Sequence, residues 1–422
     1  MLTGKGGERG VAAQPGEGAV GRLAIALSLG HFLAFVDRFT LAALIPVLGP
    51  RLALDDAATG LLLGPCFALP YATAALFPRK PMHGLAGGIA LWSASGAAMG
   101  FVNSFEGLAA VRLGLGVGQA AFIPAAMALV AARPGRARAA GLAMFTMASA
   151  FGRNVALVSA GGGLAALAWF GVGAVPYGWR WLCVVTILPN IVLLMVLIRW
   201  RAKVSGAMAA PGSAAAPTPA PAGGMRTMLL YLLAAMPVLV IQSLAAWLPT
   251  LMARQHGLEP ARAAMVGGIA MLIGSPLGQG LGGVMMARWP QARERGGAAL
   301  VTLLALAIVP ALVAVGAGTT VAVAGITLAA AMLGMSAFAG LFMVQQEIAP
   351  ARRAQASGAF LTVITLVGIG IGPLAAGVAS GHNAGGIAGG LMIVMIAAAA
   401  TALLLLIVSR KLGRPSMAPA AP

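Results

Sequence analysis

The stretch His31-Phe-Leu-Ala-Phe-Val-Asp37-Arg38-Phe39-Thr40 places an acid next to a base within the otherwise apolar segment 22–48. About 20 apolar residues are enough for a helix to cross the hydrocarbon core of a bilayer. A charge at the centre of such a helix costs on the order of 3 kcal/mol, so it is usually retained for function. We therefore interpret Asp37 and Arg38 as the centre of a functional site within a membrane helix.

The composition is that of a polytopic membrane protein. The chain has 422 residues, of which 60% are hydrophobic and 9% are charged, whereas soluble chains carry about 25% charged residues. The net charge of +18 does not indicate nucleic acid, because Lys and Arg recur between apolar runs rather than on one soluble face. We expect no enzyme activity and no cofactor or metal, because the chain has no nucleotide-binding loop or catalytic triad and its two cysteines lie in apolar runs.

Twelve apolar segments, read as helices, follow one another along the chain. They lack the alternation of membrane strands, so we predict an all-α membrane protein. The segments are 22–48, 58–78, 84–102, 107–131, 139–165, 180–200, 226–252, 262–287, 297–316, 319–346, 355–378 and 385–409. A Pro/Ala/Gly-rich linker divides them into six and six. The expected organisation is a disordered tail 1–20, a bundle 21–200, a linker 201–225, a second bundle 226–409 and a tail 410–422.

The distribution of positive charge predicts the orientation. With the N-terminus inside, most Lys and Arg residues fall on the cytoplasmic side, as the positive-inside rule requires. The outer loops then hold Arg51, Arg180, Arg254 and Arg262. We therefore expect both termini to be cytoplasmic, in a bacterial-type inner membrane, and the protein to be a monomer.

Four short patterns occur in a fixed order along the chain. They are Asp37-Arg38-Phe39-Thr40, Arg112-Leu-Gly114-Leu-Gly116-Val-Gly118-Gln119-Ala120, Gly178-Trp179-Arg180-Trp181 and Gly368-Ile-Gly370-Ile-Gly372-Pro373. Together they resemble the major facilitator superfamily, and the first two are similar to its spinster-type branch. The resemblance spans essentially the whole chain. It implies two pseudo-symmetric six-helix bundles and a secondary transporter that works by rocking alternating access.

The chain departs from the pattern of this family at three places. The loop after the second apolar segment, Ala75-Leu-Phe-Pro78-Arg79-Lys80, lacks the family's Asp. Gln119 stands where the spinster-type branch has a Glu, and an amide cannot carry a proton. Arg153-Asn154 replaces small residues. These departures leave Asp37 as the main candidate for proton coupling.

Four charged residues are expected at similar depth in the first bundle. From 1.5 Å per residue, Asp37 lies roughly 22 Å and Arg153 roughly 21 Å from the cytoplasmic side, with Arg38 beside Asp37 and Arg112 nearby. We predict that they line one cavity. The excess of Arg over Asp favours an anionic substrate, since guanidinium groups bind carboxylate, phosphate or sulfate. The alternative is that Asp37 pairs with one Arg as a packing clamp while the others reach water.

Other polar residues are weaker candidates. His31 is a candidate for proton binding or for packing, and Gln119 for substrate binding. Arg79, Glu347 and Arg352 are candidates for a cytoplasmic gate. The polar residues of the second half suit an apolar or amphipathic substrate body, or ordinary packing: Gln242, Ser243, Trp247, Ser275, Gln279, Ser336, Phe338, Thr362 and Thr365.

The predicted function is secondary transport of a small organic or amphipathic anion by rocking alternating access. The driving force is either a proton gradient that acts through Asp37 or, if the protein is a uniporter, none. A lipid or drug efflux transporter is one alternative. A membrane sensor or scaffold that keeps the fold without transporting is another. The expected partners are the substrate, the lipid bilayer and protons.

Overall fold

The structure is a computed structural model that describes residues 17–74, 81–131, 135–171, 178–200, 224–348 and 359–412. Within these ranges the chain is helical, with short connections and no strand. The predicted all-α fold is therefore confirmed. The linker 201–223, most of both tails, and the gate candidates Arg79 and Arg352 lie outside the described residues.

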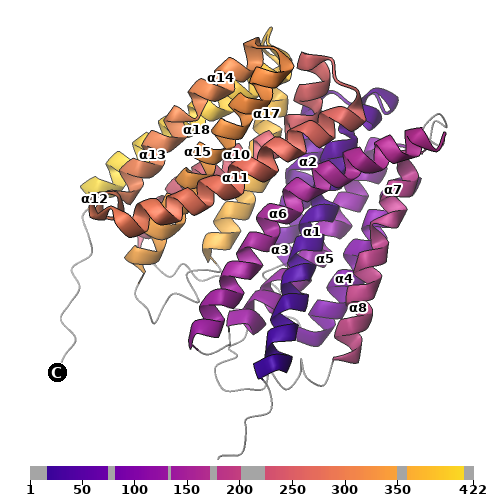
Figure 1. The fold of residues 1–422 in the computed structure, drawn as a ribbon, viewed down its shortest axis with the longest axis horizontal. Coiled ribbons are helices and arrows are strands. Elements are labelled where there is room, and N and C mark those ends of the chain that lie inside the picture. The colour runs from indigo at the N-terminus through magenta and orange to yellow at the C-terminus, as the bar shows by residue number, and fades with distance from the viewer. Residues whose placement is uncertain are drawn as a thin grey trace, which may run out of the picture.

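The first half of the chain forms one bundle, which we call the N-bundle (Figure 1). Its helices pack mainly as α1 on α6 and α4 on α5. Their bounds are α1 Glu17–Arg51, α2 Asp56–Leu63, α3 Pro65–Ala74, α4 Pro81–Ala98 with the 3₁₀ turn η1 Met99–Phe101, α5 Phe105–Ala131, α6 Gly135–Trp169, α7 Trp179–Val185 and α8 Ile187–Arg199.

The second half forms the C-bundle, in which α11 packs on α15 and α10 packs on α18. Its elements are α10 Met225–His256, α11 Pro260–Arg288, α12 Pro290–Glu294, α13 Gly296–Leu306, α14 Ile308–Gly316, α15 Thr319–Glu347, the π-helix η4 Ile364–Ile371, α17 Gly372–Gly381 and α18 Gly386–Lys411.

The helix boundaries differ from the expected ones in a few places. α1 begins at Glu17, so residues 17–20 of the expected tail are helical, and α18 continues to Lys411. Eleven helices in the described ranges are long and apolar enough to cross a membrane. The expected segment 84–102 corresponds to α4 and η1 and is not among these eleven.

Several spans are interrupted. The second span changes from α2 to α3 at Gly64, which is followed by Pro65, and a Pro has no N–H to continue a helix. The eleventh span contains the π-helix η4 directly before Gly372 and Pro373. π-helical segments are often found at functional sites. Both interruptions lie where the two bundles meet, because η4 packs against α3.

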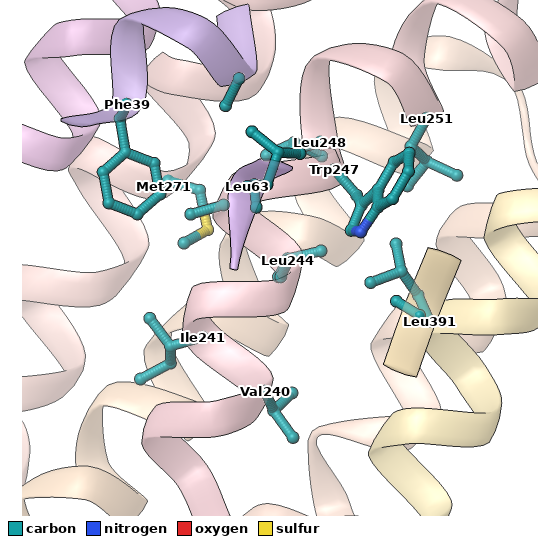
Figure 2. Packing of buried hydrophobic residues seen from close by; sticks show 14 of the residues in the cluster. Phe39, Leu63, Val240, Ile241, Leu244, Trp247, Leu248, Leu251, Met271 and Leu391 are labelled. Atoms are coloured by element: carbon teal, nitrogen blue, oxygen red, sulfur yellow. The ribbon is translucent and has the colours of Figure 1, made fainter. Parts of the chain in front are cut away.

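Among the described residues, the two bundles pack together mainly on one side. We call the side where α1 begins and α18 ends the termini side. The largest buried cluster includes residues of both bundles, and Figure 2 shows Phe39 and Leu63 of the N-bundle among Ile241, Leu244 and other residues of the C-bundle. Two further clusters occupy the termini side. One belongs to the N-bundle except for Ile369, and the other to the C-bundle alone. In Figure 1 the bundles diverge towards that side.

Glycines allow the helices to touch on the side opposite the termini. A Cβ added to Gly161 of α6 would lie 2.5 Å from the carbonyl oxygen of Ala261 and 2.7 Å from the amide nitrogen of Met265, both in α11. A Cβ on Gly60 of α2 would lie 2.7 Å from the carbonyl oxygen of Pro373. Because these neighbours are backbone atoms, they cannot move aside without separating the helices.

We therefore expect Gly161→Ala to push α6 away from α11 and to destabilise this arrangement by about 1–3 kcal/mol, the usual cost of overpacking. The adjacent Gly162→Ala is the matched control, because a Cβ there meets only the Met265 sulfur, at 3.9 Å. Thermal unfolding of the purified protein measures the effect. Equal melting temperatures for the two variants would contradict the close contact of α6 with α11.

Candidate functional site

Asp37 faces the interior of the N-bundle. Its carboxylate is buried and accepts a hydrogen bond of 2.7 Å from Nδ2 of Asn190 in α8. The side chains of Trp92 and Thr186 approach the same carboxylate. No ion pair joins Asp37 to a basic residue within the described part of the chain. The clamp with an arginine, which the sequence left open, is therefore not formed in this conformation.

Arg38 points to a different side of α1, because successive helical residues face about 100° apart. Its Nε and Nη2 donate to Oε1 of Gln119 at 3.2 and 2.6 Å. The guanidinium carbon lies 4.2 Å from the ring centre of Phe35 and 4.0 Å from that of Phe67. Cation–π contacts and a neutral amide thus stabilise this buried cation in place of a carboxylate.

Gln119 links α1 to α5. Its Oε1 accepts from Arg38, and its Nε2 donates to the carbonyl oxygen of Ala34 at 2.7 Å. The side chain is fully buried. Both ends of the amide are therefore hydrogen-bonded, and the residue orients Arg38.

Arg112 joins three helices through main-chain oxygens. Its guanidinium donates to the carbonyls of Leu62 and Leu63 at the end of α2, at 2.9 and 3.0 Å, and to that of Arg38 at 2.9 Å. The last carbonyls of a helix have no partner within the helix. Arg112 supplies the missing donors at the break between α2 and α3, so it has a structural role in this conformation.

Arg153 reaches from α6 into the C-bundle. Its Nη1 donates to Oε1 of Gln242 at 2.8 Å, and its Nη2 contacts the Ser275 hydroxyl at 3.4 Å. The neighbouring Asn154 donates to the carbonyl oxygen of Met271 at 3.1 Å. The structure therefore connects Arg153 to residues of α10 and α11 rather than to Asp37.

His31 packs against α6. Its ring stacks on Phe145 with a centroid distance of 4.1 Å, and Nδ1 is 2.7 Å from the carbonyl oxygen of Phe145. This is the environment of a packing residue with a satisfied hydrogen bond. Its role in proton binding stays a prediction.

A small cavity lies between the bundles. It is lined by Arg38, Phe39, Ala42, Leu63, Arg112, Gln242, Ala246, Ile369 and Pro373, and has room for about one water molecule. Of the residues that the sequence indicated, it brings together Arg38, Arg112 and Gln242. Asp37, Arg153, His31 and Gln119 do not line it, although Gln119 and Arg153 each contact a residue that does.

Charged contacts lie at both ends of the molecule. Glu347 forms a bidentate ion pair with Arg226, at 2.7 and 3.0 Å, which joins two helices of the C-bundle on the termini side. On the other side, Arg254 of the C-bundle pairs with Asp56 of the N-bundle at 2.7 Å, and the Ser380 hydroxyl donates to the same carboxylate. The second pair connects the bundles.

Three of the polar residues named in the second half serve packing. Ser243 and Ser336 donate to carbonyl oxygens of Leu239 and Leu300, and the Trp247 indole donates to that of Pro373 at 2.9 Å.

Sequence reasoning missed Asn190 and Asp56. Asn190 lies in the apolar run 180–200, where an amide is unusual enough to have been a signal. Asp56 carries no such signal, because nothing in its neighbourhood indicates the distant Arg254 or Ser380.

Comparison with known proteins identifies the family. The family model described as Major Facilitator Superfamily matches residues 27–373. The chain belongs to the major facilitator superfamily. A curated relative, the MFS-type efflux pump of Mycolicibacterium smegmatis, is 33% identical over 186 residues, which is 41% of this chain and 41% of the relative. The match thus spans less than half the length of that relative.

Solved structures of this superfamily share the fold. A bacterial homologue of the human lysosomal transporter Spinster, in an inward-facing and occupied conformation, has a TM-score of 0.72 at 20% identity, and covers 94% of this chain and 98% of its own. The peptide transporter POT has a TM-score of 0.66 at 15% identity, with 93% and 95% covered. The predicted superfamily fold is confirmed, and spinster-type structures are among its neighbours.

We expect Arg112→Lys to lower the free energy of unfolding by roughly 3 kcal/mol, although the charge is kept. A lysine ammonium cannot donate in the planar fork that reaches three carbonyls, and each hydrogen bond from a charged group contributes about 1.5–3 kcal/mol. Chemical denaturation of the purified protein measures this. The exposed Arg288→Lys is the control, and an equal stability of both variants would refute the structural role of Arg112.

Proposed function

We propose that this membrane protein is a secondary transporter that carries a small organic or amphipathic anion by alternating access. The observation that carries the proposal is that Arg38, Arg112 and Arg153 are buried at the interior with only neutral partners among the described residues. Membership of the superfamily supports transport as the activity.

The charge balance of the interior favours an anion. Asp37 is the one buried carboxylate within the described ranges, and it contacts none of the three arginines. The positive charges of the three arginines are therefore not neutralised, and like charges repel one another strongly in a medium of low dielectric constant. An anion that enters beside Arg38 would lower this energy, and a guanidinium can hold its oxygens in a bidentate way.

The arrangement of the bundles supports alternating access. They are tied together on the side opposite the termini by the Asp56–Arg254 pair and the glycine contacts, and their buried clusters are separate on the termini side. This is the arrangement of an inward-facing conformation if both termini are cytoplasmic. We propose that orientation, in a bacterial-type inner membrane, for a monomeric transporter.

Asp37 is our candidate for proton coupling. Oδ1 of Asn190 is buried without a hydrogen-bond donor among the described residues, whereas Nδ2 donates to Asp37. An amide beside a carboxyl group can bond to either protonation state, because it donates to a carboxylate and, after rotation, accepts from a carboxylic acid. Asp37 could therefore take up a proton without losing its partner.

Drug or lipid efflux is the second candidate function. The relative with 33% identity is named an MFS-type efflux pump. Most residues that line the cavity are apolar, among them Phe39, Leu63 and Ile369. Such walls also suit a hydrophobic substrate, with transport in the outward direction.

The role of Asp37 is tested by uptake of radiolabelled carboxylates into proteoliposomes with and without an imposed pH gradient. Asp37→Asn is expected to abolish the stimulation by the gradient, because an amide cannot exchange a proton. Asp55→Asn is the control, since Asp55 only accepts a hydrogen bond from the Ala58 amide at the start of α2. Full stimulation of Asp37→Asn would show that coupling uses another group.

A labelling experiment separates a transporter from a locked sensor or scaffold. Ala42→Cys, made in a chain in which Cys66 and Cys183 are replaced by Ser, places one thiol at the cavity. An impermeant thiol reagent is expected to modify it from either side of the membrane, because alternating access opens the cavity to each side in turn. Modification from one side only would contradict transport.

A further inference from the structure

The side chains at the cavity offer hydrogen-bond donors. Its polar lining consists of Arg38 and Arg112 from the N-bundle and Gln242 from the C-bundle. A guanidinium carries five N–H groups and no acceptor. A ligand that carries an ammonium group would need an acceptor or a negative charge at the cavity.

Nearby side-chain oxygens already have donors. Oε1 of Gln119 accepts two hydrogen bonds from Arg38, and Oε1 of Gln242 accepts from Arg153 at 2.8 Å. Asp37 turns away towards Asn190.

Three main-chain oxygens of the lining residues are used as well. The carbonyl of Leu63 accepts from Arg112, and so does that of Arg38. The carbonyl of Pro373 accepts from the indole of Trp247.

Donors, in contrast, remain available. Arg38 uses Nε and Nη2 towards Gln119, so Nη1 is left for a ligand. The rings of Phe35 and Phe67 lie close to its guanidinium carbon.

Gln242 is oriented by Arg153. The guanidinium attracts the carbonyl end of the amide and would repel its NH₂ end, so Oε1 is held towards Arg153 and Nε2 is directed elsewhere. Because Gln242 also lines the cavity, its NH₂ group is the polar atom that the C-bundle can offer to a ligand there.

We propose that the cavity accepts an anion that carries no ammonium group, with Gln242 as its contact on the C-bundle and Arg153 as the residue that positions Gln242. This inference rests on the proposed anion transport. An ammonium group next to the anionic group would lie near the guanidinium groups of Arg38 and Arg112. No carboxylate among the described residues lines the cavity to offset this repulsion, which is strong in a medium of low dielectric constant. The bundles must part to admit such a ligand, since the cavity holds about one water molecule in this conformation.

Hexanoate and norleucine test the inference, because they share a carbon skeleton and a carboxylate and differ by one ammonium group. Binding to the full-length protein in detergent is measured by the shift in melting temperature over a titration. Hexanoate is expected to bind at least about tenfold more tightly, since the repulsion of one ammonium group by two nearby guanidinium groups costs more than about 1.4 kcal/mol.

Variants assign the effect to Gln242. Gln242→Glu replaces the donor by an acceptor and is expected to reduce the preference for hexanoate by about tenfold. Arg153→Gln leaves Gln242 free to rotate, so it is expected to lower the same ratio, which a purely structural role would not change. Gln255→Glu, on the exposed end of the same helix, is the control and keeps the wild-type ratio.

The outcomes separate the two proposals. Equal binding of hexanoate and norleucine by the wild type overturns this inference and leaves anion transport standing. A preference that Gln242→Glu does not change overturns the role of Gln242. Binding of neither compound overturns the anionic substrate, and this inference with it.

Discussion

The N-bundle depends on how Arg112 is accommodated in an apolar interior. Its guanidinium donates to three carbonyl oxygens, two at the end of α2 and one in α1. In lipid every backbone polar group must find a partner within the protein. The break at Gly64 leaves such groups without helical partners, and Arg112 supplies them. The charge and the break therefore stabilise one another, and removing either leaves the other unsatisfied.

The other two buried arginines are also stabilised by neutral groups rather than by carboxylates. Arg38 is stabilised by an amide and aromatic rings, and Arg153 by two amides and a hydroxyl group. Neutral partners satisfy the hydrogen bonds of a cation without cancelling its charge. The interior consequently keeps a positive potential that an ion pair would have removed. This potential is the basis of our proposal that the substrate is an anion rather than a neutral solute.

The fold was predictable from the sequence because membrane helices are encoded locally. Apolar length, the linker 201–225 and the four family patterns each depend on neighbouring residues. The sequence indicated several of the buried polar residues, although not Asn190, and it did not indicate which of them contact one another. Depth along a helix placed Arg153 level with Asp37, but only tertiary packing decides that its side chain crosses to Gln242. Asp56 and Ser380 are 324 positions apart, and nothing local indicates their contact.

The adjacent charged residues Asp37 and Arg38 point to different sides of α1. Arg38 lines the cavity between the bundles, whereas Asp37 bonds to Asn190 inside the N-bundle. A substrate at one and a proton at the other would therefore not compete for the same space. Asp37 and Arg38 are neighbours on the backbone of α1, and the carbonyl oxygen of Arg38 accepts a hydrogen bond from Arg112. A shift of α1 that follows the protonation of Asp37 would move Arg38 together with the hydrogen bond between its carbonyl oxygen and Arg112. In the mechanism that we propose, coupling between the two sites would need movement of one helix and no direct contact between proton and substrate.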